Sequence, residues 1–446
     1  MNRLFFGMSL VLVLAQGALA DQVSTFSLAN GMQAIVIEDH RAPVVINMIW
    51  YRAGSADEKR GKSGIAHFLE HLMFKGTKTL APGAFSKVVE ANGGNDNAFT
   101  STDMTAYHQR IAADRLELVM KMEADRMRNL VLSEEDVKTE RDVILEERSQ
   151  RIDSQPEGLF QEQLAAAQYL NHPYGVPIIG WRTEMETLSR QDALDWYRLY
   201  YAPNNATLIV AGDVDPADVQ RLAETYFGPL APSPAITERA RPAEPAQLAE
   251  RRLSFADPNI SRPYVTRSYL APERDAGAQE KAAALTFLAA LLGGDRQTSL
   301  LSRALSFDQK IAISVGAAYD GVSLDDTTFT LYVVPVPGVG LKEAEAAMDK
   351  VIADFMAKGV DPDQFKRLKT QLTAALIYQK DSVGDLAETY GSAVTAGLTV
   401  KDVEDWPALL QAVTEADVVA AAREVLDRRR AVTGWAMRDI AQEVMQ

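Results

Sequence analysis

Apolar and polar positions in the first half of the chain alternate with two different periods, and the changes of period predict a series of strands and helices. Between residues 23 and 53 the apolar residues stand at every second position or in short runs, which is typical of strands. Farther on they recur at helical spacing, and two pairs three residues apart, Ser133 with Asp136 and Ser189 with Asp192, mark helix starts. In chain order the pattern predicts strands at 35–37 and 44–49, helices at 64–74 and 84–91, strands at 96–101 and 105–111, helices at 114–127 and 133–148, and a helix after Ser189 that leads into a strand at 206–211.

A polar, proline-rich stretch then interrupts the pattern. Five prolines fall between residues 229 and 245, and because proline fixes φ and lacks an N–H, no helix or strand tolerates this density. Beyond it the order of elements begins again, with strands at 252–255 and 264–270, a helix at 279–292, strands at 311–318 and 327–334, helices at 341–356, 361–379 and 416–426, and a strand at 431–436. We therefore predict an α+β protein of two homologous α/β halves, each a mixed sheet with helices packed on it, at residues 21–228 and 250–446 and joined by a linker at 229–249.

Residues 1–20 have the pattern of a secretory signal peptide. Arg3 gives a positive start, residues 4–14 are mostly apolar, and Ala18-Leu19-Ala20 supplies small residues at the positions that signal peptidase reads. An uncleaved membrane anchor is the alternative, but the apolar run is shorter than the ~20 residues that cross a bilayer. We expect an exported protein, periplasmic or secreted, with no membrane span after cleavage.

Composition narrows the chemistry that this chain can perform. Its 446 residues carry a formal net charge of -15, which argues against nucleic acid or anionic lipid as a partner. The chain has no Cys, so it cannot use disulfides, thiolate metal ligands or a Cys nucleophile. A metal site would therefore be built from His, Asp or Glu, and the chain contains only five His.

Two of these histidines stand four residues apart in the predicted helix at 64–74. In the motif His67-Phe68-Leu69-Glu70-His71, positions i, i+3 and i+4 share one face, so both imidazoles and the Glu70 carboxylate project to the same side. Zinc prefers nitrogen and oxygen ligands in a tetrahedron, and a catalytic site leaves one position open for water. The motif therefore predicts a zinc site with an acid beside it rather than a helix that carries these residues by coincidence.

A third ligand has to come from another segment. Glu140 and Glu147 lie two turns apart on one face of the predicted helix at 133–148, whereas Glu146 points about 100° away. Spacing alone leaves two interpretations open for Glu147, a metal ligand or one of the solvated charges that Glu/Arg-rich helices usually carry.

These residues resemble the pitrilysin and insulin-degrading-enzyme family of zinc metallopeptidases, and most closely its smaller bacterial members similar to mitochondrial processing peptidase. The His-x-x-Glu-His order is the signature of the inverted zinc-peptidase motif. In that family the third ligand is a Glu about 76 residues beyond the second His, where this chain has Glu147. The resemblance further implies one Zn²⁺ per chain held by His67, His71 and Glu147, Glu70 as general base, and Glu140 as a support of the site.

The same family has an edge strand that receives extended substrate, and the segment 93–100 is similar to it. A peptide would add its backbone at Asn97, Ala98 and Phe99, so that main-chain hydrogen bonds provide affinity. The resemblance thus implies a zinc-dependent endopeptidase that hydrolyses oligopeptides or unfolded segments with a metal-activated water.

One feature of the complete family enzymes is missing. They carry an Arg and, seven residues later, a Tyr in the second half, which hold substrate and stabilise the oxyanion. This chain has Ser306 and Ile313 at those positions, and neither side chain can replace them. Arg262 and Tyr269 have the right separation, but they lie on an earlier strand-like run with an odd spacing, which puts them on opposite faces. The resemblance then implies the zinc-bearing subunit of a heterodimer with a homologous partner.

Two other classes of function stay open. The chain could be a non-catalytic scaffold or peptide-binding subunit of the same fold, although an intact set of His67, Glu70, His71 and Glu147 argues against this. It could also be a chaperone with structural zinc, but structural zinc sites usually have four protein ligands and the sequence offers three.

Overall fold

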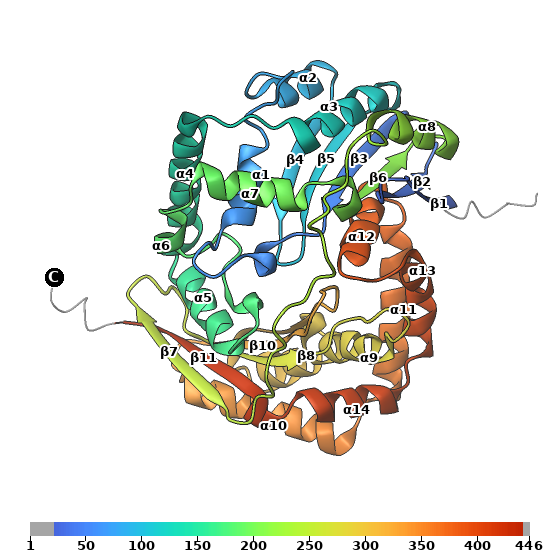
Figure 1. The fold of residues 1–446 in the computed structure, drawn as a ribbon. Coiled ribbons are helices and arrows are strands. Elements are labelled where there is room, and N and C mark those ends of the chain that lie inside the picture. The colour runs from blue at the N-terminus through green and yellow to red at the C-terminus, as the bar shows by residue number, and fades with distance from the viewer. Residues whose placement is uncertain (1–21, 440–446) are drawn as a thin grey trace, which may run out of the picture.

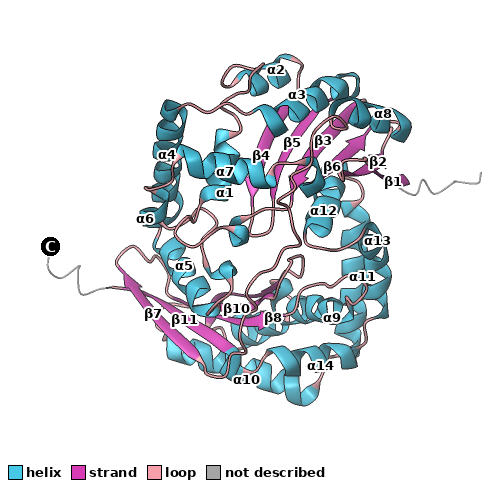
Figure 2. Cartoon of the chain, in the orientation of Figure 1, coloured by secondary structure: helices cyan, strands magenta, loops and turns pink. Residues whose placement is uncertain are grey.

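The structure is a computed structural model that describes residues 22–439. It has two mixed sheets with helices packed on them, as Figures 1 and 2 show. The predicted signal peptide at residues 1–20 lies outside the described residues.

The first sheet has six strands in the order β1-β2-β6-β3-β5-β4. β2 and β6 run parallel, and the remaining neighbours are antiparallel. Its strands are β1 (Gln22–Ser27), β2 (Gln33–Glu38), β3 (Val44–Tyr51), β4 (Asn95–Thr100), β5 (Thr105–Ala112) and β6 (Ala206–Gly212). β4 therefore forms one edge of the sheet.

The second sheet repeats this topology without a counterpart of β1. Its order is β7-β11-β8-β10-β9, the first pair is parallel, and the rest are antiparallel. Its strands are β7 (Arg251–Asp257), β8 (Tyr264–Ala271), β9 (Ala312–Tyr319), β10 (Thr327–Pro335) and β11 (Ala431–Arg438). The prediction of two homologous α/β halves with mixed sheets is confirmed, and β9 occupies the place that β4 has in the first sheet.

Both halves contain helices that pack on their sheets. The first half contains α1 (Ile65–Leu72), α2 (Ala84–Ala91), α3 (Leu116–Asn129), α4 (Glu134–Arg148), α5 (Pro156–Gln168), α6 (Arg182–Met185), α7 (Arg190–Tyr200) and α8 (Pro216–Tyr226). The second half contains α9 (Glu280–Ala289), α10 (Leu341–Lys358), α11 (Pro362–Gln379), α12 (Val383–Thr395), α13 (Val400–Ala412) and α14 (Glu415–Val425). Both predicted capping boxes are present: Ser133 accepts from the Asp136 N–H, and Ser189 accepts from the Asp192 N–H.

Each half supplies one helix to the sheet of the other half. Figure 1 shows α12, from the second half, beside β6 and β3. Its Tyr390 belongs to a buried apolar cluster with Trp50 of β3, which is 1% exposed. In return Phe160 of α5 lies in a cluster with Val432 of β11. A sheet with two apolar faces needs cover on both, and this exchange provides it, so the two halves share their cores.

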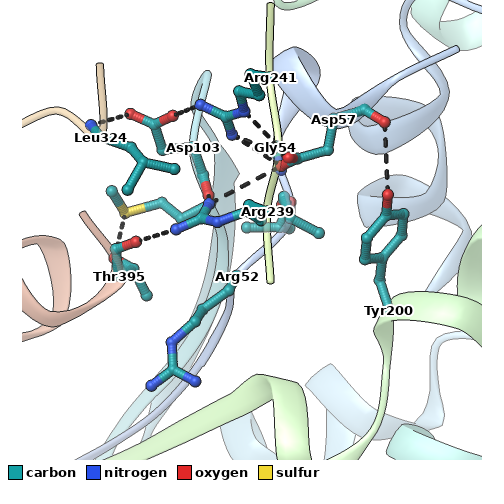
Figure 3. A network of polar contacts seen from close by, with 12 residues as sticks. Arg52, Gly54, Asp57, Asp103, Tyr200, Arg239, Arg241, Leu324 and Thr395 are labelled. Carbon is teal, nitrogen blue, oxygen red and sulfur yellow. Dashed lines mark hydrogen bonds and ion pairs between the residues drawn. The ribbon is translucent and has the colours of Figure 1, made fainter. Parts of the chain in front are cut away.

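The linker has no helix or strand between α8 and β7, yet it is held firmly. Arg241 forms ion pairs of 3.0 Å with Asp57 and 2.5 Å with Asp103 in the first half (Figure 3). It also forms an ion pair of 2.9 Å with Asp325, which lies between β9 and β10. Arg239 donates hydrogen bonds to the carbonyl oxygens of Asp103 and Thr395. Because the side chains of Arg241, Asp57 and Asp103 are buried, removal of one of these partners would leave the others uncompensated, and the linker thus holds the two halves together.

Candidate metal centre

The helix with the two-His motif has a fixed start and a fixed orientation. The backbone at Gly64 has φ 87°, and a Cβ there would lie 2.5 Å from the Ile179 carbonyl oxygen, so only Gly fits. The Glu58 carboxylate accepts hydrogen bonds from the N–H groups of Gly64 and Ala66 at 2.8 and 2.9 Å. Phe68, Leu69 and Leu72 are fully buried in the first core and direct the opposite face of α1 outward.

His67 and His71 lie on that face, and α4 brings Glu147 to them. The Glu147 Oε2 atom is 3.6 Å from His67 Nε2 and 3.4 Å from His71 Nε2. Ligand atoms of these three residues lie within 4.8 Å of one another. Between residues 22 and 439 no other group of three His, Cys, Asp or Glu side chains offers such a set.

The separations fit zinc. In a tetrahedron with bonds of about 2.0–2.2 Å, neighbouring ligand atoms are about 3.3–3.6 Å apart. The His71 Nδ1–H donates to Glu140 Oε1 at 2.8 Å, which leaves Nε2 of this imidazole free to bind a metal. Burial, and to a smaller extent the charge of the nearby His71, lowers the pKa of His67 to about 3. His67 is therefore neutral and can act as a ligand.

Two basic residues extend the centre that the sequence motif alone defined. Lys75 Nζ lies 2.5 Å from Glu140 Oε2, and Arg151 Nη1 lies 2.9 Å from Glu147 Oε1. Burial raises the pKa of Glu140, but the hydrogen bonds from His71 and Lys75 outweigh it and lower the pKa overall. Glu140 therefore stays ionised beside His71. Lys75 stands four residues after His71, just beyond the end of α1, and Arg151 stands four residues after Glu147, so a search for cations at i+4 could have found both.

Glu70 lies on the same face of α1 and is 8% exposed. Burial raises the pKa of its carboxyl group, while a 2.6 Å hydrogen bond from the Thr100 hydroxyl opposes that rise. A carboxylate in this environment is suited to accept a proton from a water molecule near the metal ligands. Thr100 was not singled out in the sequence, although it ends the segment 93–100.

The residues of the predicted substrate strand have separate surroundings. The Phe99 ring packs edge-on against Trp50 at 5.3 Å between ring centroids, so its side chain belongs to the interior. Asn97 is exposed, and its Oδ1 accepts from the Ala98 N–H at 2.9 Å. Because β4 pairs with β5 on one side only, its backbone forms an edge at Ala98.

The second half offers no Arg or Tyr at the positions noted above. Ser306 lies in a π-helical turn (Ser302–Asp308), and Ile313 is 47% exposed on β9. Arg262 and Tyr269, which stand seven residues apart, do not lie together: Tyr269 is 1% exposed in the second core, whereas Arg262 precedes β8 on the surface.

The remaining histidines lie away from the centre. Each has an acidic or interior environment of its own: His40 lies 2.7 Å from Asp213, His172 lies 3.2 Å from Asp325, and burial lowers the pKa of His108.

Between residues 22 and 439 no helix combines the length and apolar character needed to cross a membrane.

Comparison with known proteins identifies the family. Residues 34–181 match the family model "Insulinase (Peptidase family M16)", and residues 187–372 match "Peptidase M16 inactive domain". The chain is 29% identical over 441 residues to zinc protease PqqE of Helicobacter pylori, covering 96% of this chain and 97% of that protein.

Solved structures agree with the sequence comparison. The crystal structure of a protease from Helicobacter pylori superposes with a TM-score of 0.86 at 26% identity, covering 94% of this chain and 100% of that one. The first half of the periplasmic protease PqqL from Escherichia coli has the same fold, with a TM-score of 0.78 at 21% identity over 93% of this chain and 92% of that one. The predicted resemblance is confirmed, and the chain belongs to peptidase family M16.

Proposed function

We propose that this protein is a zinc-dependent endopeptidase that cleaves oligopeptides or unfolded segments. The observation that carries the proposal is the convergence of His67, His71 and Glu147 at separations suited to a tetrahedral zinc ion, with Glu70 on the same helix face. Membership of peptidase family M16 supports a peptidase role.

The roles of the residues follow from their surroundings. Zinc in the centre would lower the pKa of a coordinated water toward about 7 and polarise the scissile carbonyl. Glu70 accepts the proton of the attacking water and delivers it to the leaving amine. Glu140 fixes the orientation of His71 through the 2.8 Å hydrogen bond to Nδ1 and keeps that imidazole basic.

Substrate would bind as an added strand on β4. In an antiparallel pair, alternate residues direct their N–H and C=O away from the partner strand. The Ala98 N–H bonds to the Asn97 side chain instead of to β5, so Ala98 points to the open edge. A peptide would replace the Asn97 amide at this N–H, and it would be recognised mainly by its extended backbone.

We further propose that the chain is the zinc-bearing subunit of a heterodimer in an exported compartment. Ser306 and Ile313 provide neither a guanidinium nor a phenol, so a homologous partner would supply the Arg and Tyr that hold substrate. The signal-peptide pattern of residues 1–20 and the periplasmic relative PqqL support export.

Metal analysis and hydrolysis of a quenched fluorogenic peptide test this function. We expect about one zinc per chain, and hydrolysis that requires a homologous partner chain. Glu70→Gln should retain zinc and lose about 10²–10⁴-fold in kcat. Zinc without hydrolysis in any mixture would favour the scaffold or chaperone, and full activity of the isolated chain would refute the heterodimer.

A further inference from the structure

We propose that Thr100 is a positioning residue that holds the Glu70 carboxylate in place and links it to the substrate strand. The inference rests on the proposed peptidase function, because it concerns the base of that reaction. Thr100 ends β4, and its hydroxyl lies 2.6 Å from Glu70 Oε2. No other hydrogen bond to the Glu70 side chain is found among residues 22–439.

The surrounding hydrogen bonds determine that the Thr100 hydroxyl is the donor in its bond to Glu70. Among residues 22–439 the other hydrogen-bond partner found for the Thr100 hydroxyl is the Thr105 hydroxyl, at 3.4 Å. The Thr105 proton is already used, because Thr105 is fully buried and donates to the Ala53 carbonyl oxygen at 2.9 Å. Thr100 therefore donates to the Glu70 Oε2 atom, and this carboxylate oxygen accepts. A hydrogen bond from a hydroxyl to a charged carboxylate is among the stronger kinds.

The position of Thr100 in the strand connects this bond to substrate. Ala98 and Thr100 are two residues apart, so their backbone groups face the same open edge of β4 and their side chains share one face of the sheet. Ala98 packs against the core under α1, and Thr100 reaches Glu70 on α1 from that face. A peptide paired with β4 is thus held by the same short segment that holds the base.

The consequence for Glu70 is geometric. One carboxylate oxygen is fixed by Thr100, and the other remains available for the attacking water. Without the hydroxyl the carboxylate can rotate about its terminal torsion, and a misplacement of about 1 Å at a reacting group costs up to about 100-fold in rate. Substrate affinity should change little, because the peptide pairs with the backbone of β4, which the substitution leaves intact.

Thr100→Val removes the hydroxyl and keeps the shape of the side chain, and Thr100→Ser keeps the hydroxyl. In the zinc-loaded protein with its partner we expect Thr100→Val to lower kcat by about 10- to 100-fold with KM within about twofold, and Thr100→Ser to retain at least about half of kcat. Thr100→Ala repeats the hydroxyl deletion in case the Val variant fails to fold. Thr79→Val is the matched control, since the Thr79 hydroxyl also donates to a carboxylate, that of Asp125, at 2.6 Å, and it should leave kcat unchanged.

A second readout does not depend on activity. In a crystal structure of the zinc-loaded Thr100→Val chain, the Glu70 carboxylate should move by more than about 1 Å while His67 and His71 keep their positions. This displacement in a chain that hydrolyses no peptide would support the role of Thr100 and reject the proposed function. An undisplaced Glu70, an unchanged kcat in Thr100→Val, or an equal loss in Thr100→Ser would each overturn the role of Thr100.

Discussion

Replacement of Glu140 by Ala should weaken zinc binding without touching a zinc ligand. Glu140 is 7% exposed, and its two oxygens contact His71 Nδ1 at 2.8 Å and Lys75 Nζ at 2.5 Å. The Ala variant removes the acceptor that orients the imidazole. It also leaves the Lys75 ammonium without its carboxylate near a divalent cation.

The size of the effect follows from these two contacts. Loss of a partner that orients a metal-binding His costs about 10- to 100-fold in metal affinity, which corresponds to about 1.4–2.7 kcal/mol. Glu140→Gln keeps an oxygen acceptor for the His71 N–H but loses the charge, so its loss of zinc affinity should be near the lower end of this range, about 10-fold.

Competition with a chromophoric chelator measures the zinc Kd. Glu146→Ala is the matched control, because Glu146 lies on the same helix but accepts a hydrogen bond from Gln150 on the surface. The zinc Kd of this variant should equal that of the unchanged chain. A zinc Kd for Glu140→Ala within about twofold of the unchanged chain, with the fold intact, would refute this reasoning.

Two further predictions concern the frame around the centre. A Cβ at Gly391 of α12 would lie 2.1 Å from Trp50 Cε2, so Gly391→Ala should lower the free energy of unfolding by about 1–3 kcal/mol in thermal melts. Gly384→Ala on the same helix is the control: its Cβ would meet no atom nearer than 3.4 Å, so it should have little effect. Burial raises the pKa of Glu273 to about 7, so between pH 4.5 and 7 the folded chain binds a proton that the unfolded chain has released. The stability that this proton contributes is complete below about pH 4.5 and is lost as the pH rises through 7; it amounts to on the order of 1–2 kcal/mol after solvent screening. In thermal melts from about pH 5 to 8, Glu273→Gln should flatten the dependence of stability on pH. An unchanged dependence would exclude Glu273 as its source.

Much of the architecture could be predicted because local signals agreed with the tertiary structure. The alternating run before residue 53 forms β2 and β3, and the Ser133 and Ser189 capping boxes begin α4 and α7. The motif at His67 and His71 faces one side because Phe68, Leu69 and Leu72 are buried. The convergence with Glu147 depended on the family resemblance, since spacing within a charged helix does not reveal which carboxylate meets a distant imidazole.

Other features depend on contacts between distant segments. Helices α5, α6, α8, α12 and α13 were not predicted. Of these, α5 and α12 owe their places to the sheet of the opposite half, which no local pattern specifies. The linker looked like a passive connection because its prolines exclude regular structure, yet Arg241 binds carboxylates from both halves. The place of the Phe99 ring beside Trp50 also depends on the folded sheet, because alternate residues of β4 face opposite sides of it. The pairing of substrate with the backbone at Asn97, Ala98 and Phe99 stays a prediction.

The most direct test of the account is an anomalous difference map of crystals of the zinc-loaded chain, recorded at the zinc absorption edge. We predict one strong peak about 2.0–2.2 Å from His67 Nε2, His71 Nε2 and Glu147 Oε2. A zinc peak at another place, or a metal bound to the two imidazoles with the Glu147 carboxylate turned away, would contradict the central claim.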